Sequence, residues 1–372
     1  MTDKKNSNFP TEAEVVIVGV GGIVGSMLAY WLAEFGQKNI IGLEKSSVIP
    51  SDIASTAHAS DFVYNTTHDK LGCWTTDFSR KFYEDNGFFL KKGGLEICRK
   101  DDDARWEELK RKVSSGKAFG TNIRLISAAE AKEKFPLLDE ESIRGAMWDP
   151  DAGLVTPRSQ DVVSFAVETA KDKGALRTFT DTPAIDFEIE NDRIVGVKTD
   201  KGTIKTNKVV IASGIWGPLM GKKAGVPVPL MPLEHPLLFF GPLPEAQGAE
   251  DFLVYPLLRD QGNSAYVRDT GRLHGGMLEW GFYEDKNPRL VDPEDIGNPE
   301  KTMGSDSMRY LDLEEVAEPL EKAFETTPIL NELGWDEKSS FNGLLSVTPD
   351  AGSLIGESPE VRGFWLCEAV WV

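Results

Sequence analysis

Histidine and cysteine are scarce in this chain, which holds four histidines and three cysteines among 372 residues. Cys73, Cys98 and Cys367 are odd in number and widely spaced, so the sequence shows neither a disulfide framework nor a zinc-binding pattern. The motifs H-E-x-x-H, C-x-x-C and G-x-S-x-G are also absent. We therefore expect no metal ion, and the hydrolase classes with these motifs find no support.

Positive charge and long apolar runs are lacking too. The chain has 41 Lys and Arg against 60 Asp and Glu, a formal charge of −19, which would repel nucleic acid and anionic bilayers. No stretch approaches the length of a membrane-spanning helix. The opening residues, "MTDKKNSNFPTEAE", have the character of neither a secretory signal nor a transit peptide. We expect no nucleic-acid or membrane partner and a cytoplasmic location.

A β-strand, a glycine turn, a helix and a second strand open the chain. Hydrophobic residues make up 40% and charged residues 27%, which is typical of a globular protein, and the length suits two lobes. "EVVIV" at 14–18 reads as a buried parallel strand. "GIVGSMLAYWLAEFG" has helical spacing and ends at Gly36, and "KNIIGLEK" is a second strand that ends in Glu44. The order predicts a βαβ unit.

The turn of this unit resembles a dinucleotide-binding loop with one extra residue. Gly19, Gly21, Gly22 and Gly25 give G-x-G-x-x-x-G instead of G-x-G-x-x-G. Glycines at such a turn let the backbone approach a pyrophosphate at the helix N-terminus. Glu44 can accept hydrogen bonds from an adenosine ribose, and it would repel a 2′-phosphate, which disfavours NADP.

A second nucleotide signal, "VVIASGIWG" at 209–217, follows a stretch of strand-like alternation from 184 to 212. An apolar strand that ends in small residues after such a meander favours a two-segment FAD domain over an NAD domain. Helices are predicted at 104–114 and 158–173, and a capping box at Ser127.

Several stretches together resemble a known family. They are "VVIVGVGGIVGSMLAYWLAEFG", "STAHA", "KKGGLEI", "FPLLD", "VVIASGIWG", "LMPLEH", "FNGLLSVTPDAGSLIGESPE" and "GFWLCEAVWV". In this order they are similar to D-amino-acid-oxidase-like FAD-dependent oxidoreductases. More narrowly, they resemble the branch of dimethylglycine oxidases and dehydrogenases and sarcosine dehydrogenases. The resemblance runs from about residue 13 to the last residue.

The resemblance implies a two-lobed α/β fold. A discontinuous, Rossmann-like FAD lobe would comprise residues 1–75, 140–225 and 335–372. A substrate lobe with a mixed sheet would comprise 76–139 and 226–334. The implied reaction is oxidative demethylation of a small N-methyl amino acid, dimethylglycine first and sarcosine second, by hydride transfer from the N-methyl carbon to flavin N5. The imine product would yield formaldehyde, or methylenetetrahydrofolate if a tetrahydrofolate module joins.

The family pattern also assigns residues. His58 stands where family members bond the flavin covalently through its 8α-methyl group. His235 matches the active-site histidine, which could favour the neutral amine, and Tyr266 matches a tyrosine over the flavin that helps to hold substrate. The positions assigned to cofactor binding are Gly19, Gly21, Gly22, Ile23, Val24, Gly25, Glu44, Lys45, Ser55, Thr56, Ala57, His58, Phe62, Ala184, Gly214, Trp216, Val370, Trp371 and Val372.

Four further residues carry weaker interpretations. Arg259 and Arg268 could pair with a substrate carboxylate, although a solvated arginine is the favoured interpretation of each. His68 and His274 match no motif and are interpreted as structural or surface residues.

The resemblance also raises a question about the end of the chain. In family members the final strand leads into a helix whose N-terminus faces the flavin, and then into a folate-binding region. The chain ends at "CEAVWV", so we expect a fragment, a truncated product or half of a split enzyme. One alternative function is a non-catalytic regulatory or interaction relative, and another is an NAD-dependent Rossmann dehydrogenase. Either oxygen or an electron-transfer protein is compatible as the electron acceptor.

Overall fold

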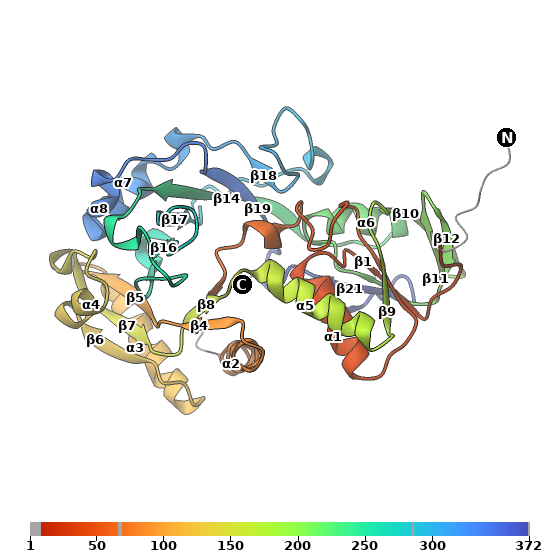
Figure 1. Cartoon of the computed structure of the whole chain (residues 1–372), viewed down its shortest axis with the longest axis horizontal. Coiled ribbons are helices and arrows are strands. Elements are labelled where there is room, and N and C mark those ends of the chain that lie inside the picture. The colour runs from red at the N-terminus through yellow and green to blue at the C-terminus, as the bar shows by residue number, and fades with distance from the viewer. Residues whose placement is uncertain (1–8, 66–68, 285, 371–372) are drawn as a thin grey trace.

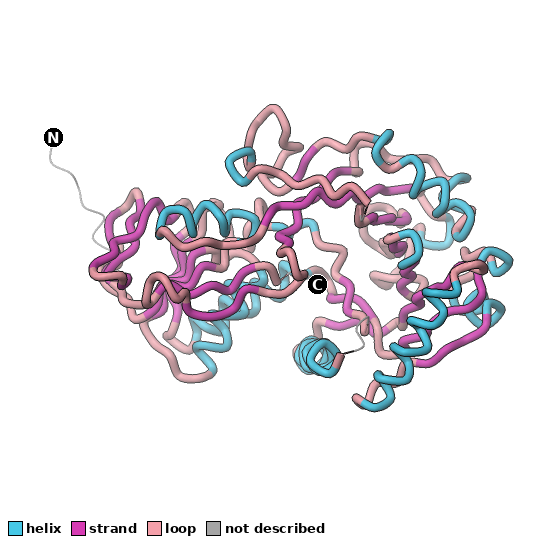
Figure 2. The backbone as a smooth tube through the Cα atoms, turned by 180° about the vertical axis from the view of Figure 1, so that it is seen from behind, coloured by secondary structure: helices cyan, strands magenta, loops and turns pink. Residues whose placement is uncertain are grey.

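The computed structural model describes residues 9–65, 69–284 and 286–370. Figure 1 shows two lobes side by side, and Figure 2 shows the same division from behind, with strands gathered in each lobe. The predicted α/β, two-lobed class is confirmed. Trp371, Val372 and His68 lie outside the described residues.

The first lobe is built on a six-stranded sheet in which β20 alone runs antiparallel to its neighbour. Its strands, in spatial order, are β20 (Leu354–Glu357), β21 (Phe364–Glu368), β13 (Val209–Ile211), β1 (Val15–Val18), β2 (Ile40–Leu43) and β9 (Leu176–Phe179). Strands β1 and β2 are buried along their whole length, and β13 is buried except at the half-buried Val210, in line with the apolar runs at these places.

The two faces of this sheet bury different partners because side chains alternate along a strand. Val15 and Ile17 face the helices α1 (Ile23–Glu34) and α5 (Ser159–Asp172), while Val16 and Val18 face the opposite layer. That layer is a three-stranded antiparallel sheet, together with α6 (Gly217–Ala224). Its strands are β10 (Ala184–Glu190), β11 (Arg193–Thr199) and β12 (Gly202–Lys205). The meander predicted over 184–212 is therefore confirmed.

The second lobe is built on a nine-stranded mixed sheet. In spatial order its strands are β18 (Met308–Arg309), β19 (Phe341–Val347), β14 (Met231–Phe240), β17 (Leu278–Phe282), β16 (Ala265–Asp269), β15 (Leu257–Asp260), β5 (Gly94–Arg99), β7 (Ile143–Asp149) and β6 (Arg124–Ser127). A core that includes the fully buried Trp280 and Phe135 covers one face. This lobe also contains the helices α3 (Asp103–Ala118), α4 (Ala128–Lys134), α7 (Ala317–Thr326) and α8 (Ile329–Glu332).

A small antiparallel sheet follows the segment that carries His58. It comprises β3 (Phe62–Val63), β8 (Gly153–Val155) and β4 (Phe89–Lys91), and α2 (Lys70–Asp85) lies beside it. The capping box at Ser127 is present at the start of α4.

The residue boundaries of the two lobes stay a prediction. Two strands pair in a sheet of the other lobe than the one that these boundaries assign to them. β7 and β19 fall in ranges assigned to the FAD lobe, and both pair within the nine-stranded sheet of the second lobe. The burial of β7 and β19 does not alternate regularly, and the local sequence does not show which sheet accepts either strand.

Candidate active site

The glycine turn between β1 and α1 is closely packed, and this packing explains its composition. Gly19 has a φ of +92°, and a Cβ there would lie 2.4 Å from the Ala212 carbonyl oxygen. A Cβ on Gly25 would lie 2.1 Å from the carbonyl oxygen of Gly19, so the helix can approach the strand only with glycine there. Gly22 is the N-cap residue of α1, and its three-residue distance from Gly25 is that of the ordinary fingerprint. The extra residue therefore lies in the turn ahead of the helix.

The open side of this turn fits a pyrophosphate. A Cβ on Gly22 would meet nothing closer than 3.7 Å, so a ligand could approach the backbone there. The Ile23 amide donates to Thr56 Oγ1 (3.1 Å). The amides of Val24 and Gly25 follow it in the first turn of α1, where no carbonyl of the same helix can accept them. Amides at a helix N-terminus attract anions.

Glu44 is buried at the end of β2 and holds the turn together. Its Oε2 accepts from the Gly21 amide (2.8 Å), and its Oε1 accepts from the Ser46 amide (2.9 Å) and the Ser51 hydroxyl (3.2 Å). Burial raises the pKa of this carboxyl, although these hydrogen bonds oppose the shift. A carboxylate oxygen can accept two hydrogen bonds, so Oε2 keeps capacity for a ribose hydroxyl. The ribose role stays a prediction.

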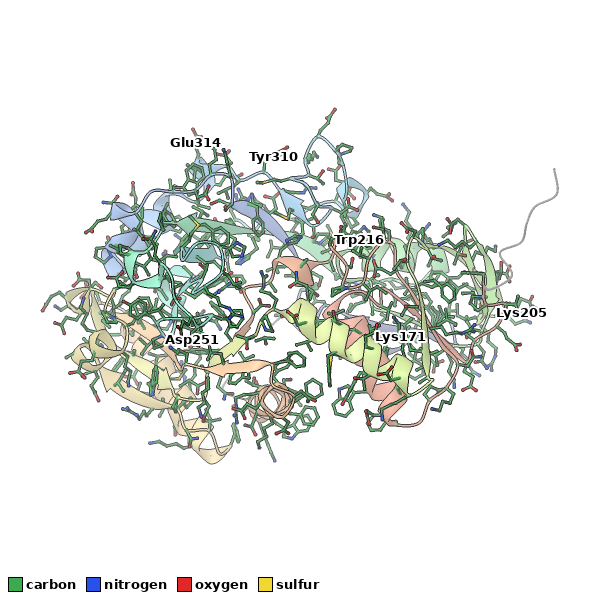
Figure 3. The ribbon with its side chains drawn as sticks, in the orientation of Figure 1. Lys171, Lys205, Trp216, Asp251, Tyr310 and Glu314 are labelled. Atoms are coloured by element: carbon green, nitrogen blue, oxygen red, sulfur yellow. The ribbon has the colours of Figure 1, made fainter. Side chains whose placement is uncertain are left out.

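The second glycine element lies where the two lobes meet. Gly214, with a φ of +55°, follows β13, and a Cβ on it would meet nothing within 4 Å. Trp216 packs with Leu344 of the second lobe, and Figure 3 labels it. The ammonium of Lys45 lies 5.1 Å from the Trp216 ring centroid and 2.6 Å from a carboxylate oxygen of Asp306.

A short helical turn, Ser55–His58, carries the histidine of "STAHA". Thr56 contacts the N-terminus of α1, and the Ser55 hydroxyl donates to the Leu344 carbonyl (2.8 Å). His58 Nε2 lies 3.3 Å from the Ser305 hydroxyl, and its ring contacts Phe341 edge-on at 5.7 Å. This turn therefore contacts both the glycine loop and the second lobe.

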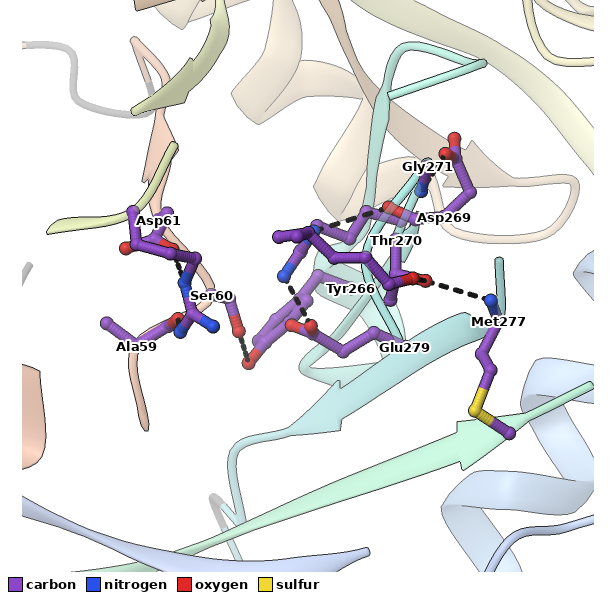
Figure 4. A network of polar contacts seen from close by, with 12 residues as sticks. Ala59, Ser60, Asp61, Tyr266, Asp269, Thr270, Gly271, Met277 and Glu279 are labelled. Atoms are coloured by element: carbon purple, nitrogen blue, oxygen red, sulfur yellow. Dashed lines mark hydrogen bonds and ion pairs between the residues drawn. The ribbon is translucent and has the colours of Figure 1, made fainter. Parts of the chain in front are cut away.

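Arg158, which the sequence did not single out, holds this turn from behind. Its Nη2 donates to the Ala59 carbonyl (3.1 Å) and, at 3.5 Å, to that of Ala57. Its Nε donates to the buried Asp61 (2.6 Å), whose carboxylate also accepts from the Ser159 amide (3.1 Å). Figure 4 shows Ala59, Ser60 and Asp61 in this segment. These contacts fix the backbone on both sides of His58.

His235 and Tyr266 come together across the nine-stranded sheet. His235 lies on β14 and Tyr266 on β16, and their side chains meet because Gly281 of β17 lies between them in the sheet. A Cβ on Gly281 would lie 2.0 Å from Tyr266 Cζ, so glycine makes room for the ring. His235 Nε2 lies 2.9 Å from the Tyr266 hydroxyl. The same hydroxyl lies 2.9 Å from the Ser60 hydroxyl (Figure 4).

Both site histidines are held neutral. Burial lowers the pKa of His235 to about 4, against a small opposing effect of the Phe282 backbone. Burial, and then the positive charge of Arg158, lowers the pKa of His58 to about 4. Burial raises the pKa of Tyr266 well above its ordinary value. At neutral pH each imidazole therefore keeps an unprotonated nitrogen.

Apolar side chains surround this polar group. Phe62 meets Tyr266 edge-on at 4.9 Å, and the Tyr283 ring lies 4.4 Å from the His235 ring. Leu237 and Phe341 join Tyr266 in one buried cluster. The hydrogen-bonded group of His235, Tyr266 and Ser60 is therefore bordered largely by aromatic and aliphatic side chains.

The other predicted site residues lie at the margins. Ala184 is buried at the start of β10, two residues after Thr182, whose amide donates to the Glu44 carbonyl (2.9 Å). Val370 is exposed directly after β21.

The favoured interpretation of Arg268 as a solvated arginine is wrong. Its side chain is 2% exposed and pairs with Glu279 at 2.6 Å, because a charge buried in this sheet needs a counter-charge. Arg259 is half-buried, 5.9 Å from the Tyr64 ring. His274 is exposed, in agreement with its interpretation as a structural or surface residue.

Within the described ranges, no group of three or more His, Cys, Asp or Glu side chains is arranged to hold a metal ion. In the same part of the chain, no helix combines the length and apolar character needed to cross a bilayer.

Residues 14–370 match the family described as "DAO: FAD dependent oxidoreductase". The chain belongs to this family. The match removes the alternative of an NAD-dependent dehydrogenase. The cradle formed by Gly22, Val24 and Gly25 and the open side of Gly214 fit the dinucleotide of this FAD-dependent family.

Individual relatives show which kinds of family member the chain is similar to. Human mitochondrial sarcosine dehydrogenase is 30% identical over 96% of this chain, and human mitochondrial dimethylglycine dehydrogenase is 28% identical over 97%. The chain spans only 37% and 40% of their lengths. The crystal structure of L-proline dehydrogenase from P. horikoshii has a TM-score of 0.77 and 26% identity, and the match covers 97% of this chain and 88% of that one.

We expect Gly25→Ala to lower the flavin content of the purified protein severalfold. The added methyl group would lie 2.1 Å from the Gly19 carbonyl oxygen, so the turn must shift. Visible absorbance per mole of folded chain measures the effect. Gly334→Ala is the matched control, because a Cβ there meets nothing within 4 Å. Equal flavin content in the two variants would contradict this account of the loop.

Acidification should reduce the stabilising contribution of His235. Its pKa is about 4 in the folded chain and 6.5 ordinarily, so between these values the unfolded chain binds the proton first. The contribution is complete above pH 6.5 and falls by about 3 kcal/mol as the pH drops to 4. Urea unfolding of the protein and of His235→Gln across this range measures it as a difference. Burial raises the pKa of Glu368 to about 7, so this group stabilises the folded chain as the pH falls. The comparison of the two proteins cancels this opposing effect. A constant difference would refute the assignment.

Proposed function

We propose that this chain catalyses the FAD-dependent oxidative demethylation of a small N-methyl amino acid, dimethylglycine first and sarcosine second. The observation that carries the proposal is the hydrogen-bonded series His235–Tyr266–Ser60, which starts at a buried neutral imidazole and ends two residues from His58. The similarity to a sarcosine dehydrogenase and a dimethylglycine dehydrogenase supports the substrate class.

The chemistry requires an amine without its proton. A carbon next to nitrogen gives up a hydride only when the nitrogen lone pair is free to stabilise the developing positive charge. The burial that keeps His235 neutral also disfavours an ammonium ion beside it. Dimethylglycine has an N–H only as the ammonium ion. The imidazole, or the Tyr266 hydroxyl bonded to it, can accept this N–H and orient the nitrogen as its proton leaves.

The apolar side chains would favour a substrate with methyl groups. Phe62, Leu237 and Phe341 can contact the N-methyl carbons without competing for the amine. Each buried methylene-sized group contributes about 0.8 kcal/mol to binding, so two methyl groups should bind more tightly than one. This difference supports dimethylglycine over sarcosine as the first substrate.

The cofactor would be held by residues of the first lobe and its neighbours. The glycine turn would bind the pyrophosphate, Glu44 the ribose, and the neutral His58 would form the covalent bond. FAD supplies the two-electron acceptor when it is bound. The low pKa of His58 supports the bond, since only an unprotonated nitrogen is a nucleophile. The imine product would hydrolyse to formaldehyde. We further propose that a tetrahydrofolate module can take up the one-carbon unit, and that the protein is cytoplasmic.

Acid denaturation tests the bond to His58. We expect the precipitated protein to stay yellow, His58→Ala to release its flavin into the supernatant, and His274→Ala, the control, to retain it. Release from the unmodified protein would remove the covalent bond and leave the fold assignment intact. Flavin in none of the proteins would favour the non-catalytic alternative, which has a counterpart among the relatives in a mouse pyruvate dehydrogenase phosphatase regulatory subunit, 27% identical to the chain.

Removal of one hydroxyl tests the substrate site. Tyr266→Phe keeps the ring and breaks both contacts of the hydroxyl, so kcat/KM for dimethylglycine should fall by about 10- to 100-fold. Tyr255→Phe is the control, because that ring packs on Phe135 at the far side of the lobe. Flavin content should be equal in both. Unchanged kinetics in Tyr266→Phe would refute the role of the hydroxyl.

A further inference from the structure

A continuous row of apolar side chains lies exposed across α1 and α2. We call it the aromatic stripe, and its members are Trp31, Phe35, Leu71, Trp74 and Phe78. The exposed fractions are 82% for Phe35, 69% for Leu71, 59% for Trp74 and 45% for Phe78. Their rings touch in series, with centroid distances of 6.0 Å for Trp31–Phe35, 5.8 Å for Trp31–Phe78 and 5.4 Å for Trp74–Phe78.

The spacing on α2 shows that the stripe extends the apolar side of the helix beyond its contact with α1. Leu71, Trp74 and Phe78 recur at i, i+3 and i+7, which puts them on one side of the helix. Phe82, four residues after Phe78 on the same side, packs on Trp31 at 6.0 Å and toward the first-lobe core, while Cys73 is buried on another side. Single exposed aromatic residues are ordinary, whereas a contiguous group of this size marks an interaction surface.

We propose that the aromatic stripe is the interface of a two-fold symmetric dimer, in which α2 of one copy packs antiparallel on α2 of a second copy. The proposal is independent of the proposed catalytic function. It rests on the area of the stripe and on the charges of α2.

The exposed area is what a small dimer interface requires. From the exposed fractions, the stripe presents about 500 Å² of side-chain surface, at the upper end of the apolar patches found on monomers. A two-fold axis buries the same patch on both copies, so the apolar contact alone reaches about 1,000 Å². That is the lower limit of a specific interface. Figures 1 and 2 both place α2 at the rim of the molecule, where a second copy can approach.

The distribution of charge favours α2 over other parts of the surface as the dimer interface. The whole chain carries −19, so two copies repel each other through most faces. Helix α2 carries three cations and three anions, a local balance of zero. The two ends of the helix also differ in charge: Lys70 at the start is positive, and Glu84 and Asp85 at the end are negative.

The antiparallel arrangement makes these charges complementary. A two-fold axis through the midpoint of α2 brings Lys70 of one copy opposite Asp85 of the other. The same axis brings Lys81 opposite Trp74, a pairing of a cation with an aromatic ring. Antiparallel helices also place the positive end of each helix dipole beside the negative end of the other. A strongly acidic partner or an anionic membrane offers none of this complementarity.

Sedimentation equilibrium of the purified protein over a range of concentrations tests the dimer. We expect a reversible monomer–dimer equilibrium that strengthens with added salt, because salt screens the repulsion between the two acidic copies. Trp74→Glu should raise the dissociation constant more than about tenfold, as loss of a central aromatic contact does. Ile355→Glu, at a residue 71% exposed on β20, is the control and should leave the constant unchanged.

Three results would overturn the proposal. They are a protein that stays monomeric at all concentrations, a Trp74→Glu variant that dimerises as the unmodified protein does, and binding of the monomer to phosphatidylcholine vesicles through Trp74. Leu71→Glu provides a second variant of the same surface should Trp74→Glu fail to fold, and circular dichroism checks both. Loss of dimerisation in either folded variant, with the control unaffected, supports the interface.

Discussion

The hydroxyl of Tyr266 ties the nine-stranded sheet to the segment that carries His58. It lies 2.9 Å from His235 Nε2 on one side and 2.9 Å from the Ser60 hydroxyl on the other. The contact with His235 is buried and the contact with Ser60 is partly buried. A buried polar group that loses its partner costs about 1–3 kcal/mol. The ring reaches this place only because Gly281, on the neighbouring strand, lacks a side chain. A substrate bound beside this hydroxyl is therefore also placed beside the cofactor segment, and the reaction proposed above depends on that placement.

Burial decides the charge state of the site. The pKa of each of His58 and His235 is lowered to about 4, so the site offers neutral acceptors at neutral pH. The cation near His58, Arg158, is balanced by the buried carboxylate of Asp61. An ammonium group that entered this environment would have no carboxylate assigned to it, whereas a neutral amine would find the imidazole. The same physical cause, removal from water, thus favours the reactive form of the substrate and the nucleophilic form of His58.

The sequence predicted the local elements well and the long-range contacts poorly. The βαβ unit follows from β-branched runs and helical spacing, whereas the close packing of Gly25 on the Gly19 carbonyl is visible only in the structure. Ser60 carried no motif, because its partner Tyr266 is 206 residues away. The sequence favours a solvated Arg268 because the strand pattern shows only that a residue faces one side of a sheet. It does not show that the neighbouring strand places Glu279 opposite Arg268. Histidine and tyrosine could be placed in one site only through the family resemblance.

The most direct test of the account is anaerobic mixing of the flavin-loaded protein with single amino acids while the yellow absorbance is followed. If a neutral imidazole and an apolar wall select an N-methyl amine, dimethylglycine and sarcosine should bleach the absorbance, and the rate should rise with pH as the amine loses its proton. Unmethylated glycine should leave the absorbance unchanged. Bleaching by glycine or L-proline at the rate seen with dimethylglycine would contradict the account, as would a yellow protein that none of the N-methyl amino acids bleaches.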